Sequence, residues 1–393
     1  MRLPTPLCTG RYWNCAKDLG QGRGDAKLKI SIILGTRPQI IKSAPVYLAF
    51  TEKGIDCEIV NTGQHYDYEM NRQFFTELKL PEPSTDLSVG AGTPNEQVSA
   101  IIRGLGRYLA GTRTDLALVP GDTNSALAAG VACSKSGVPV AHLESGCRSG
   151  DLRMAEEVNR RVLDHMSQVL LCPTQNCVKN VRSEHVLAER VSNVGDTMYD
   201  SLLRFKPSVE RLDTASRKGL RRGSYAFMTL HRAETVDNGA GLRRTLGAVD
   251  SLGIPVAFSV HPRTRERMKE FGVTPGSNIE LLEPLPYLET LALINSSRFV
   301  ITDSGGLQKE AYWLGKPTLI ARDTTEWGEI VSAGAAFLVG GSPRKMRSAF
   351  RRVGLIGRRP FLKSASIFGD GHASAKVVRE VSRYLGHGGR GED

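Results

Sequence analysis

Four side chains that could carry protons stand at or near the ends of short apolar runs. They are Asp122, Glu144, Glu156 and His231. Carboxylates and imidazoles can remove a proton from a substrate and return it. Asp122 also suits a helix N-cap, and Glu156 could simply pair with Arg160 one helical turn away. A lone histidine such as His231 is more often structural than catalytic, whereas Glu144 has no evident structural duty at a strand end.

A phosphate site is predicted at Asp303-Ser304-Gly305-Gly306, which follows the apolar run 299–301 and precedes a helix-like segment, 307–314. The free N–H groups of a first helical turn and the positive end of its dipole bind phosphate. Two glycines let a diphosphate approach the backbone closely. Glu310, further along this helix, could accept hydrogen bonds from ribose hydroxyls. Such a turn most often only caps a helix, so the prediction depends on the other groups.

Cations at the ends of other runs could complete this site. Arg37 and Lys42 follow the first run, from where they could meet a diphosphate across a cleft, although a loop arginine and a solvated lysine are equally good interpretations. Arg148 and Arg322 also follow apolar runs and are assigned to substrate binding. Several acids beside a diphosphate cradle suit proton abstraction coupled to loss of a nucleotide leaving group.

Neither a metal nor a cofactor is expected, because the chain has no metal motif, dinucleotide fingerprint or nucleophile elbow. His142-x-Glu144 superficially resembles the zinc deaminases, but these need a Pro-Cys-x-x-Cys segment that Cys172-Pro173 does not supply. The seven scattered cysteines match no zinc spacing well. They are interpreted as reduced, mostly buried thiols of a cytoplasmic protein.

The apolar runs that position these groups alternate with amphipathic helical stretches. The predicted strands are 30–34, 57–60, 116–119, 138–143 and 169–172, and then, after a basic stretch at 206–223, 226–230, 256–260, 279–282, 299–302 and 318–321. Helices are predicted between them, for example at 40–53, 96–109, 126–136 and 156–165. This alternation predicts an α/β fold of two Rossmann-like, doubly wound domains facing a cleft. Ligands of such sheets bind beyond the carboxyl ends of the strands, where the polar residues lie.

The charge and the apolar content of the chain limit the classes of partner that it is expected to bind. The net charge is +11, and part of it lies in two basic segments, 211–222 and 344–359, which we interpret as solvated surface. Neither segment interleaves aromatic residues with its cations, so no nucleic-acid partner is expected. No apolar run approaches membrane-spanning length, and no membrane partner is expected. Residues 1–27 lack the apolar block of a signal peptide and are predicted to be a disordered extension.

Seven motifs occur in an order that is specific to one family. They are Gly-Thr-Arg-Pro-Gln-Ile-Ile-Lys, Gly-Asp-Thr-Asn, His-Leu-Glu-Ser-Gly-Cys-Arg, Glu-Glu-Val-Asn-Arg, His-Arg-Ala-Glu, Thr-Asp-Ser-Gly-Gly-Leu-Gln-Lys-Glu-Ala and Arg-Asp-Thr-Thr-Glu. On these motifs the chain resembles the non-hydrolysing UDP-N-acetylglucosamine 2-epimerases over residues 29–384. The resemblance implies the glycosyltransferase-B arrangement, with an N-terminal domain at 28–192, a UDP-binding domain at 193–369 and a C-terminal helix, 370–388, that returns to the first domain.

The resemblance also implies a mechanism and its residues. A base removes the C2 proton while UDP leaves C1, which gives a 2-acetamidoglucal, and UDP then adds back with protonation on the other face. The motifs assign proton handling to Asp122, Glu144 and Glu156, and stabilisation of UDP to His231. The groups implied to hold the diphosphate and the ribose are Arg37, Lys42, Ser304, Gly305, Gly306 and Glu310. The expected partners are a UDP-sugar and a second copy of the chain in a homodimer.

Some positions depart from the family pattern. Ala155 replaces the usual Pro, Trp327-Gly328-Glu329 stands where many members have Arg-Pro-Glu, and Gln64-His65-Tyr66-Asp67 keeps only part of the segment that binds an activating second substrate. Some residues look more like a sister branch that epimerises UDP-2,3-diacetamido-2,3-dideoxyglucuronic acid, namely Gln39, Asn193-Val194-Gly195-Asp196, Lys309 and Thr325-Glu326-Trp327. His231-Arg232-Ala233-Glu234 fits plain acetylglucosamine epimerases of archaeal type about as well.

A substrate of that branch would need a cation for its extra carboxylate, and Arg148, Arg153 and Arg232 are the candidates. Three alternatives of other kinds are a glycosyltransferase of the same architecture, a hydrolysing epimerase and a non-catalytic nucleotide-sugar binder. A glycosyltransferase would not need three carboxylates aimed at C2, and a mere binder could lose them. Each of the three arginines could equally be structural, so the acetylglucosamine substrate is expected first and the uronic acid second.

Overall fold

The computed structural model describes residues 28–64 and 68–387. The extension predicted at 1–27 and the segment 65–67 of the expected second-substrate motif lie outside this range, as do Cys8 and Cys15. The other five cysteines are buried free thiols. None of the helices in the described ranges is long and apolar enough to cross a bilayer.

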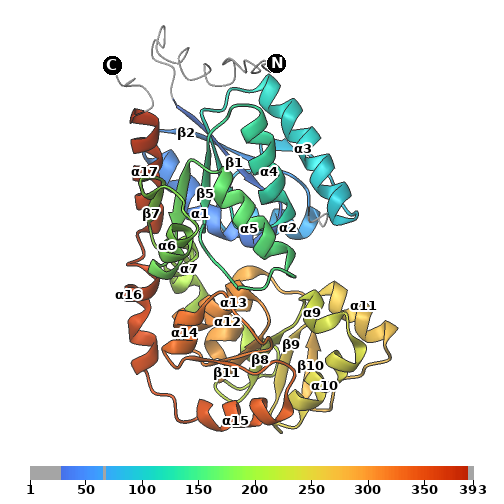
Figure 1. Cartoon of the computed structure of the whole chain (residues 1–393). Helices are drawn as coiled ribbons and strands as arrows, with labels where there is room; N and C mark the ends of the chain where they lie inside the picture. The colour runs from blue at the N-terminus through green and yellow to red at the C-terminus, as the bar shows by residue number, and fades with distance from the viewer. Residues whose placement is uncertain (1–27, 65–67, 388–393) are drawn as a thin grey trace, which may run out of the picture.

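Seven parallel strands form the first sheet (Figure 1). They are β1 (Lys29–Leu34), β2 (Asp56–Asn61), β3 (Thr85–Asp86), β4 (Leu116–Pro120), β5 (Val140–Leu143), β6 (Val169–Cys172) and β7 (Val191–Asn193), in the spatial order β3-β2-β1-β4-β5-β6-β7. Strands β4, β5 and β6 are buried at every position, as expected for a sheet that is covered on both faces. The helices between these strands are α1 (Arg37–Glu52), α2 (Tyr68–Glu77), α3 (Pro94–Gly111), α4 (Asn124–Lys135), α5 (Ala155–Met166) and α6 (Gln175–Ser183).

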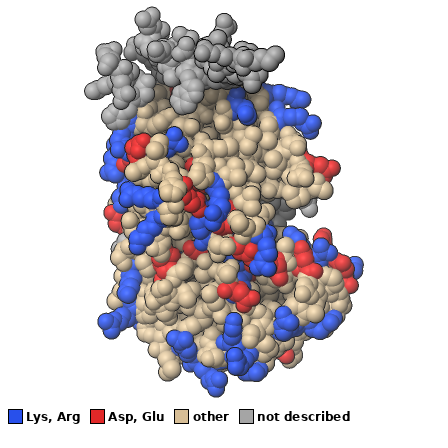
Figure 2. Space-filling model, in the orientation of Figure 1, with Lys and Arg blue, Asp and Glu red and all other residues tan. Residues whose placement is uncertain are grey.

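Six parallel strands form the second sheet. They are β8 (Ala226–Thr229), β9 (Val256–Ser259), β10 (Ile279–Leu282), β11 (Phe299–Thr302), β12 (Thr318–Ile320) and β13 (Ala336–Leu338), in the order β10-β9-β8-β11-β12-β13. Their helices are α9 (Ala233–Val236), α10 (Gly239–Asp250), α11 (Pro262–Glu270), α12 (Tyr287–Ser296), α13 (Gly305–Trp313), α14 (Gly328–Ser332) and α15 (Pro343–Val353). The molecule is therefore two parallel-sheet α/β domains in the glycosyltransferase-B arrangement, as predicted. Figure 2 shows the surface indented between them.

Two helices tie the domains together. Helix α7 (Thr197–Arg211) packs against α1 of the first domain and against α12 and α13 of the second. Helix α17 (Ala373–His387), reached through α16 (Ser364–Phe368), packs against α1, α7 and β6. This is the return expected at 370–388, although the domain bounds themselves stay a prediction.

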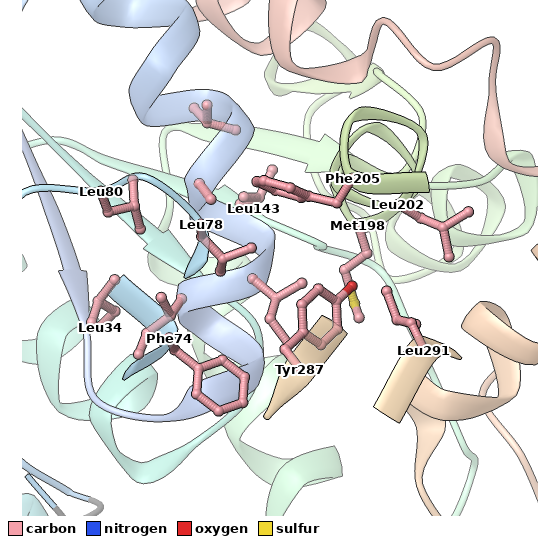
Figure 3. Packing of buried hydrophobic residues seen from close by; sticks show 14 of the residues in the cluster. Leu34, Phe74, Leu78, Leu80, Leu143, Met198, Leu202, Phe205, Tyr287 and Leu291 are labelled. Carbon is pink, nitrogen blue, oxygen red and sulfur yellow. The ribbon is translucent and has the colours of Figure 1, made fainter. Parts of the chain in front are cut away.

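The apolar core continues through this junction. Figure 3 shows Phe74 of α2 and Leu143 of β5 in one cluster with Met198 and Leu202 of α7 and with Tyr287 of α12. The rings of Phe74 and Tyr287 lie 6.1 Å apart between centroids. Burial of such large side chains gives both domains a shared, non-directional attachment on this side.

The predicted strands all exist, each within two residues of its predicted ends. The sequence interpretation missed β3, β7 and β13, which have two or three residues each. These strands are too short to show a hydrophobic period, and all three lie at or next to a sheet edge.

Candidate active site

The order of strands reverses at one place in each sheet. In the first sheet β1 lies between β2 and β4, and in the second β8 lies between β9 and β11. Connections leave the two central strands toward opposite faces there, which opens a crevice at the carboxyl ends of the strands. Arg37 and Asp122 follow β1 and β4, and His231 and Ser304 follow β8 and β11. The predicted site residues therefore lie at the switch points of both sheets.

Glu144 sits between two lysines from different domains. It follows β5 with a φ of 72°, a conformation that is costly for a side chain larger than glycine. Its carboxylate accepts a hydrogen bond from Lys309 Nζ at 2.7 Å and pairs closely with Lys42 Nζ. Lys309 is fully buried and also pairs with Asp196, the N-cap of α7. A buried ionic cluster thus joins α13 of the second domain to α1, β5 and α7.

The lysines keep Glu144 ionised. Burial alone would raise the pKa of Glu144, but the charges of Lys309 and Lys42 and their hydrogen bonds lower the pKa to about 2. In this state Glu144 can accept a proton but has none to donate. The Lys309 ammonium also lies 4.1 Å from the ring centroid of Trp327, which gives it an aromatic face as well as two carboxylates.

A buried histidine, His142, fixes the backbone next to this part of the site. His142 Nε2 lies 2.9 Å from the carbonyl oxygen of Gly121, and Nδ1 lies 2.6 Å from Asp164 Oδ1. Since a carbonyl can only accept, Nε2 must donate, and this fixes the backbone directly before Asp122. His142 therefore has a positioning role rather than a ligand role.

Asp122 is held by an arginine that reaches both domains. Its carboxylate accepts from Arg160 Nη1 at 2.8 Å, and its carbonyl oxygen accepts from Asn159 at 2.9 Å. Arg160 is buried and lies 3.6 Å from Glu326 of the second domain. The carboxylate of Asp122 remains 23% exposed, so a ligand in the cleft could reach it.

Glu156 and Arg232 form a further ion pair across the cleft. Glu156 begins α5 and Arg232 precedes α9. Burial would lower the pKa of Arg232, but nearby carboxylates outweigh this effect and raise it. These carboxylates belong to Glu156, Asp122, Glu326 and Asp303. Two predicted proton carriers of the first domain therefore surround one cation of the second.

His231 is oriented by Asp303. Its Nδ1 lies 3.0 Å from Asp303 Oδ1, and the same carboxylate accepts from the backbone N–H groups of His231 and Arg232. Burial alone would raise the pKa of Asp303, but His231 and these N–H groups lower it. An ionised Asp303 accepts from Nδ1, which directs the opposite ring nitrogen, Nε2, away from the carboxylate.

The predicted phosphate turn has the expected local structure. Ser304 caps α13, its hydroxyl accepting from the Leu307 N–H at 3.4 Å, and Gly305 and Gly306 form the first turn. A side chain at Gly305 would come within 3.4 Å of the Trp327 indole nitrogen. Further along, Glu310 is buried beside Tyr287, and burial raises the pKa of Glu310 to about 7 against the opposing effect of a hydrogen bond from Tyr287.

All four predicted substrate cations are engaged by protein groups. Lys42 pairs with Glu144, as described above. Arg148 forms a bidentate ion pair with Glu184 and a second ion pair with Asp164 at 2.7 Å. Arg322 is buried between Glu234, at 2.8 Å, and Glu326, at 3.0 Å. Arg37 stacks its guanidinium over Phe74 at 5.8 Å. Substrate binding by these four residues stays a prediction, and the contacts of Arg148 favour a structural role.

Comparison with known proteins agrees with this geometry. The family model for UDP-N-acetylglucosamine 2-epimerase matches residues 49–382. The chain belongs to this family. A crystal structure of the UDP-GlcNAc 2-epimerase of Methanocaldococcus jannaschii, in complex with UDP-GlcNAc and UDP, is 36% identical and superposes with a TM-score of 0.85, covering 91% of this chain and 100% of that one.

A second relative carries a different substrate name. The UDP-2,3-diacetamido-2,3-dideoxy-D-glucuronate 2-epimerase of Pseudomonas aeruginosa is 37% identical over 363 residues, which are 91% of this chain and 100% of the relative. Both relatives are isomerases of the family, so the enzyme class is established, whereas the choice of nucleotide sugar is not.

The sequence interpretation missed the ion pairs that this epimerase forms across the cleft. Lys309, Asp196 and Glu326 were noted only as marks of the sister branch, and Arg160 only as a possible partner of Glu156. Asp303 was included in the predicted phosphate site, but its contact with His231 was not foreseen. Among the described residues, no group of three or more potential metal ligands occurs.

Proposed function

We propose that this enzyme interconverts UDP-N-acetylglucosamine and UDP-N-acetylmannosamine. A base takes the C2 proton as the C1–O bond to UDP breaks, and the electron pair left at C2 forms the double bond of a 2-acetamidoglucal. The UDP oxygen then attacks C1 again, and a proton is delivered to the opposite face of C2. The reaction is balanced without any cofactor, and it is reversible.

The observation that carries this proposal is the complementarity of the two switch points. Carboxylates that can handle a proton stand at the ends of the first sheet, while a helix N-terminus and a histidine stand at the ends of the second. A diphosphate bound at Ser304-Gly305-Gly306 would gain from free N–H groups as negative charge builds on the leaving oxygen. With Nδ1 donating to Asp303, His231 in its imidazolium form can donate a hydrogen bond or a proton from Nε2 to the departing UDP.

The acids have different environments, which supports different roles. Glu144 is held ionised by two lysines and suits the base. Asp122 and Glu156 are partly exposed in the cleft, each paired with an arginine, and either suits the proton return on the other face. Glu310, a buried carboxyl on the helix that begins at the proposed phosphate turn, suits a ribose hydroxyl.

UDP-N-acetylglucosamine is the preferred candidate substrate because the arginines that could bind a uronic acid are already paired with carboxylates. A uronic acid would need a cation for its carboxylate, and the three candidates all have carboxylate partners. Arg148 is held by Glu184 and Asp164, and Arg232 by Glu156. Arg153 pairs with Asp151 and is 91% exposed. Binding a uronic acid would first have to break one of these pairs.

The diacetamido-uronic acid is kept as the second candidate on a specific contact. Lys309 and Trp327, which mark the sister branch in the sequence, pack on each other beside Glu144. The Pseudomonas relative is named for that substrate. A ratio of kcat/KM of about a hundredfold or more in favour of the uronic acid, equivalent to nearly 3 kcal/mol, would overturn our first choice.

Turnover in heavy water tests the chemistry directly. NMR should show deuterium at C2 of both nucleotide sugars, because the abstracted proton exchanges with solvent before it returns. Epimerised product without deuterium at C2 would contradict the proposed exchange. EDTA should leave the rate unchanged, and a full loss that added metal restores would show that a metal takes part.

Two expectations about the setting stay predictions. The buried free thiols of the described cysteines suit the reducing cytoplasm expected from the sequence. A homodimer is also expected, and light scattering of the full chain would test it.

A further inference from the structure

One surface of the second domain is strongly basic and is not used by the proposed function. It comprises α15 and the segment that follows, residues 343–363, and we call it the α15 surface. It contains eight cations and no Asp or Glu: Arg344, Lys345, Arg347, Arg351, Arg352, Arg358, Arg359 and Lys363. The net charge of the whole chain is +11, so most of the excess charge is concentrated in this short stretch.

All eight cations are exposed. Helix α15 buries Met346, Ala349 and Val353 in the core, which turns its charged face to solvent. Within the described ranges only Lys345 has a carboxylate within ion-pair distance, Asp323 at 3.7 Å. A protein that merely needed solubility would scatter charges of both signs. Here one sign is concentrated and left uncompensated.

Two leucines of the same segment protrude into solvent. Leu355 is 85% exposed and Leu362 is 77% exposed, which makes them the most exposed large apolar side chains of the described residues. Leu355 lies between Arg352 and Arg358 in the chain, and Leu362 stands beside Lys363. Exposing leucine side chains to water is unfavourable. Leucines among cations are instead complementary to a surface that is negatively charged outside and apolar beneath.

We propose that the α15 surface binds the anionic face of a lipid bilayer. Arginine side chains would contact lipid phosphates, and Leu355 and Leu362 would insert among the upper acyl chains. The protein would then associate peripherally with the membrane. This differs from the sequence interpretation, which treats 344–359 as solvated surface and expects no membrane partner. The inference does not depend on the proposed epimerase activity.

Other occupants fit less well. A second copy of the chain would bring eight cations against eight. Single-stranded nucleic acid is bound through exposed aromatic rings, and the aromatic residues here, Phe350 and Phe361, are only partly exposed. An acidic protein could pair with the cations, but binding such a protein would not explain why two leucines are exposed beside them.

The position of this surface allows catalysis to continue on a membrane. Figure 1 places α15 at the lower end of the second domain, away from the boundary with the first. Figure 2 shows Lys and Arg side chains gathered at this end of the molecule. Docking there would leave the cleft open to a nucleotide sugar from solution.

Co-sedimentation of the full chain with vesicles tests the proposal. Wild type should sediment with phosphatidylcholine vesicles that contain phosphatidylglycerol, and not with phosphatidylcholine alone. The triple variant Arg351→Gln, Arg358→Gln, Arg359→Gln should bind about a hundredfold more weakly, since each cation near an anionic surface contributes roughly fivefold. The double variant Leu355→Ser, Leu362→Ser should lose about tenfold for each leucine.

Matched controls come from the second basic segment and from other leucines. The triple variant Arg211→Gln, Arg221→Gln, Arg222→Gln removes the same charge from a segment whose two leucines are half-buried (Leu212) and buried (Leu220). It should lose less than about tenfold. Leu187→Ser removes a leucine that is 52% exposed elsewhere and should bind as wild type does.

Several outcomes would overturn the proposal. Wild type that fails to sediment with anionic vesicles refutes it, and capture by polyglutamate beads instead would indicate an acidic protein partner. Equal losses in the two triple variants would show unspecific attraction. Wild-type binding by the leucine variant would refute insertion. Epimerase turnover should be unchanged in all these variants, which shows that each one is folded.

Discussion

The carboxyl ends of the two sheets carry opposite chemistry. The first sheet ends in acids, Asp122, Glu144 and, through α5, Glu156. The second ends in cations and N–H donors, Arg232, Lys309 and the first turn of α13. One edge can therefore handle protons while the other holds negative charge, although both edges have the same strand order around the switch point.

The two edges also contact each other directly through ion pairs. Glu144 pairs with Lys309, Glu156 with Arg232, and Arg160 approaches Glu326. These pairs differ in burial, and burial decides how much each contributes. The pair at Lys309 is inside the protein, whereas the pair at Glu156 is at the rim of the cleft, so removing one partner should have very different effects at the two places.

The largest effect is expected for Lys309→Met. Lys309 is fully buried and compensates both Glu144 and Asp196. Removing it leaves two buried carboxylates with only Lys42 nearby, which should cost about 3–5 kcal/mol of unfolding free energy in urea denaturation. Turnover should fall as well, because Glu144 loses a group that holds it ionised and in place.

Two further variants control for this prediction. Lys309→Arg keeps the charge and should be clearly more stable than Lys309→Met. Adding Asp196→Asn to Lys309→Met removes one of the uncompensated acids and should restore part of the stability. Wild-type stability of Lys309→Met would show that the buried cluster does not hold the domains together.

Asp122→Asn and Glu144→Gln should each lower kcat by about 10²–10⁴-fold. Both changes keep the size of the side chain and remove its capacity to take a proton. UDP is proposed to bind at the other edge, so its affinity, measured by calorimetry, should change little. Ser304→Trp is the converse variant and should abolish UDP binding by blocking the first turn of α13. Near-normal turnover in either acid variant would remove that residue from catalysis.

Glu310 makes stability depend on pH. Burial raises its pKa from 4.5 to about 7, so the folded protein binds this proton more tightly than the unfolded chain. Its contribution is fully present below pH ~4.5 and is lost as pH rises through about 7, which amounts to roughly 3 kcal/mol. Glu310→Gln cannot ionise. The stability of this variant relative to wild type, measured from denaturation midpoints, should therefore increase between pH 5 and pH 8. A constant difference over that range would contradict the raised pKa.

The strand ends could be predicted from sequence because their signals are local. The run 299–302 stops where Asp303-Ser304-Gly305 begins, and β11 and α13 follow this pattern closely. His231 and Asp122 were found for the same reason, since each polar residue stands directly after an apolar run.

The pairing across the cleft could not be predicted in this way. Nothing near Lys309 in the chain indicates that its ammonium meets Glu144, 165 positions away. Arg148 was assigned to substrate because of its motif, but its partner Glu184 lies on a later segment whose position only the fold defines. Charge compensation between distant segments depends on tertiary structure, and a single sequence does not record it.

The smallest effect is expected at the rim, for the pair of Glu156 and Arg232. Glu156 is 32% exposed, and water screens its attraction to the arginine. A double-mutant cycle of Glu156→Gln and Arg232→Gln, measured on stability, should give a coupling of about 0.2–1 kcal/mol. Turnover of Glu156→Gln should nevertheless fall far more than this coupling predicts, because a proton carrier is lost and not just a contact. A coupling above about 3 kcal/mol would mean that this pair, rather than the buried cluster at Lys309, holds the two sheet edges together.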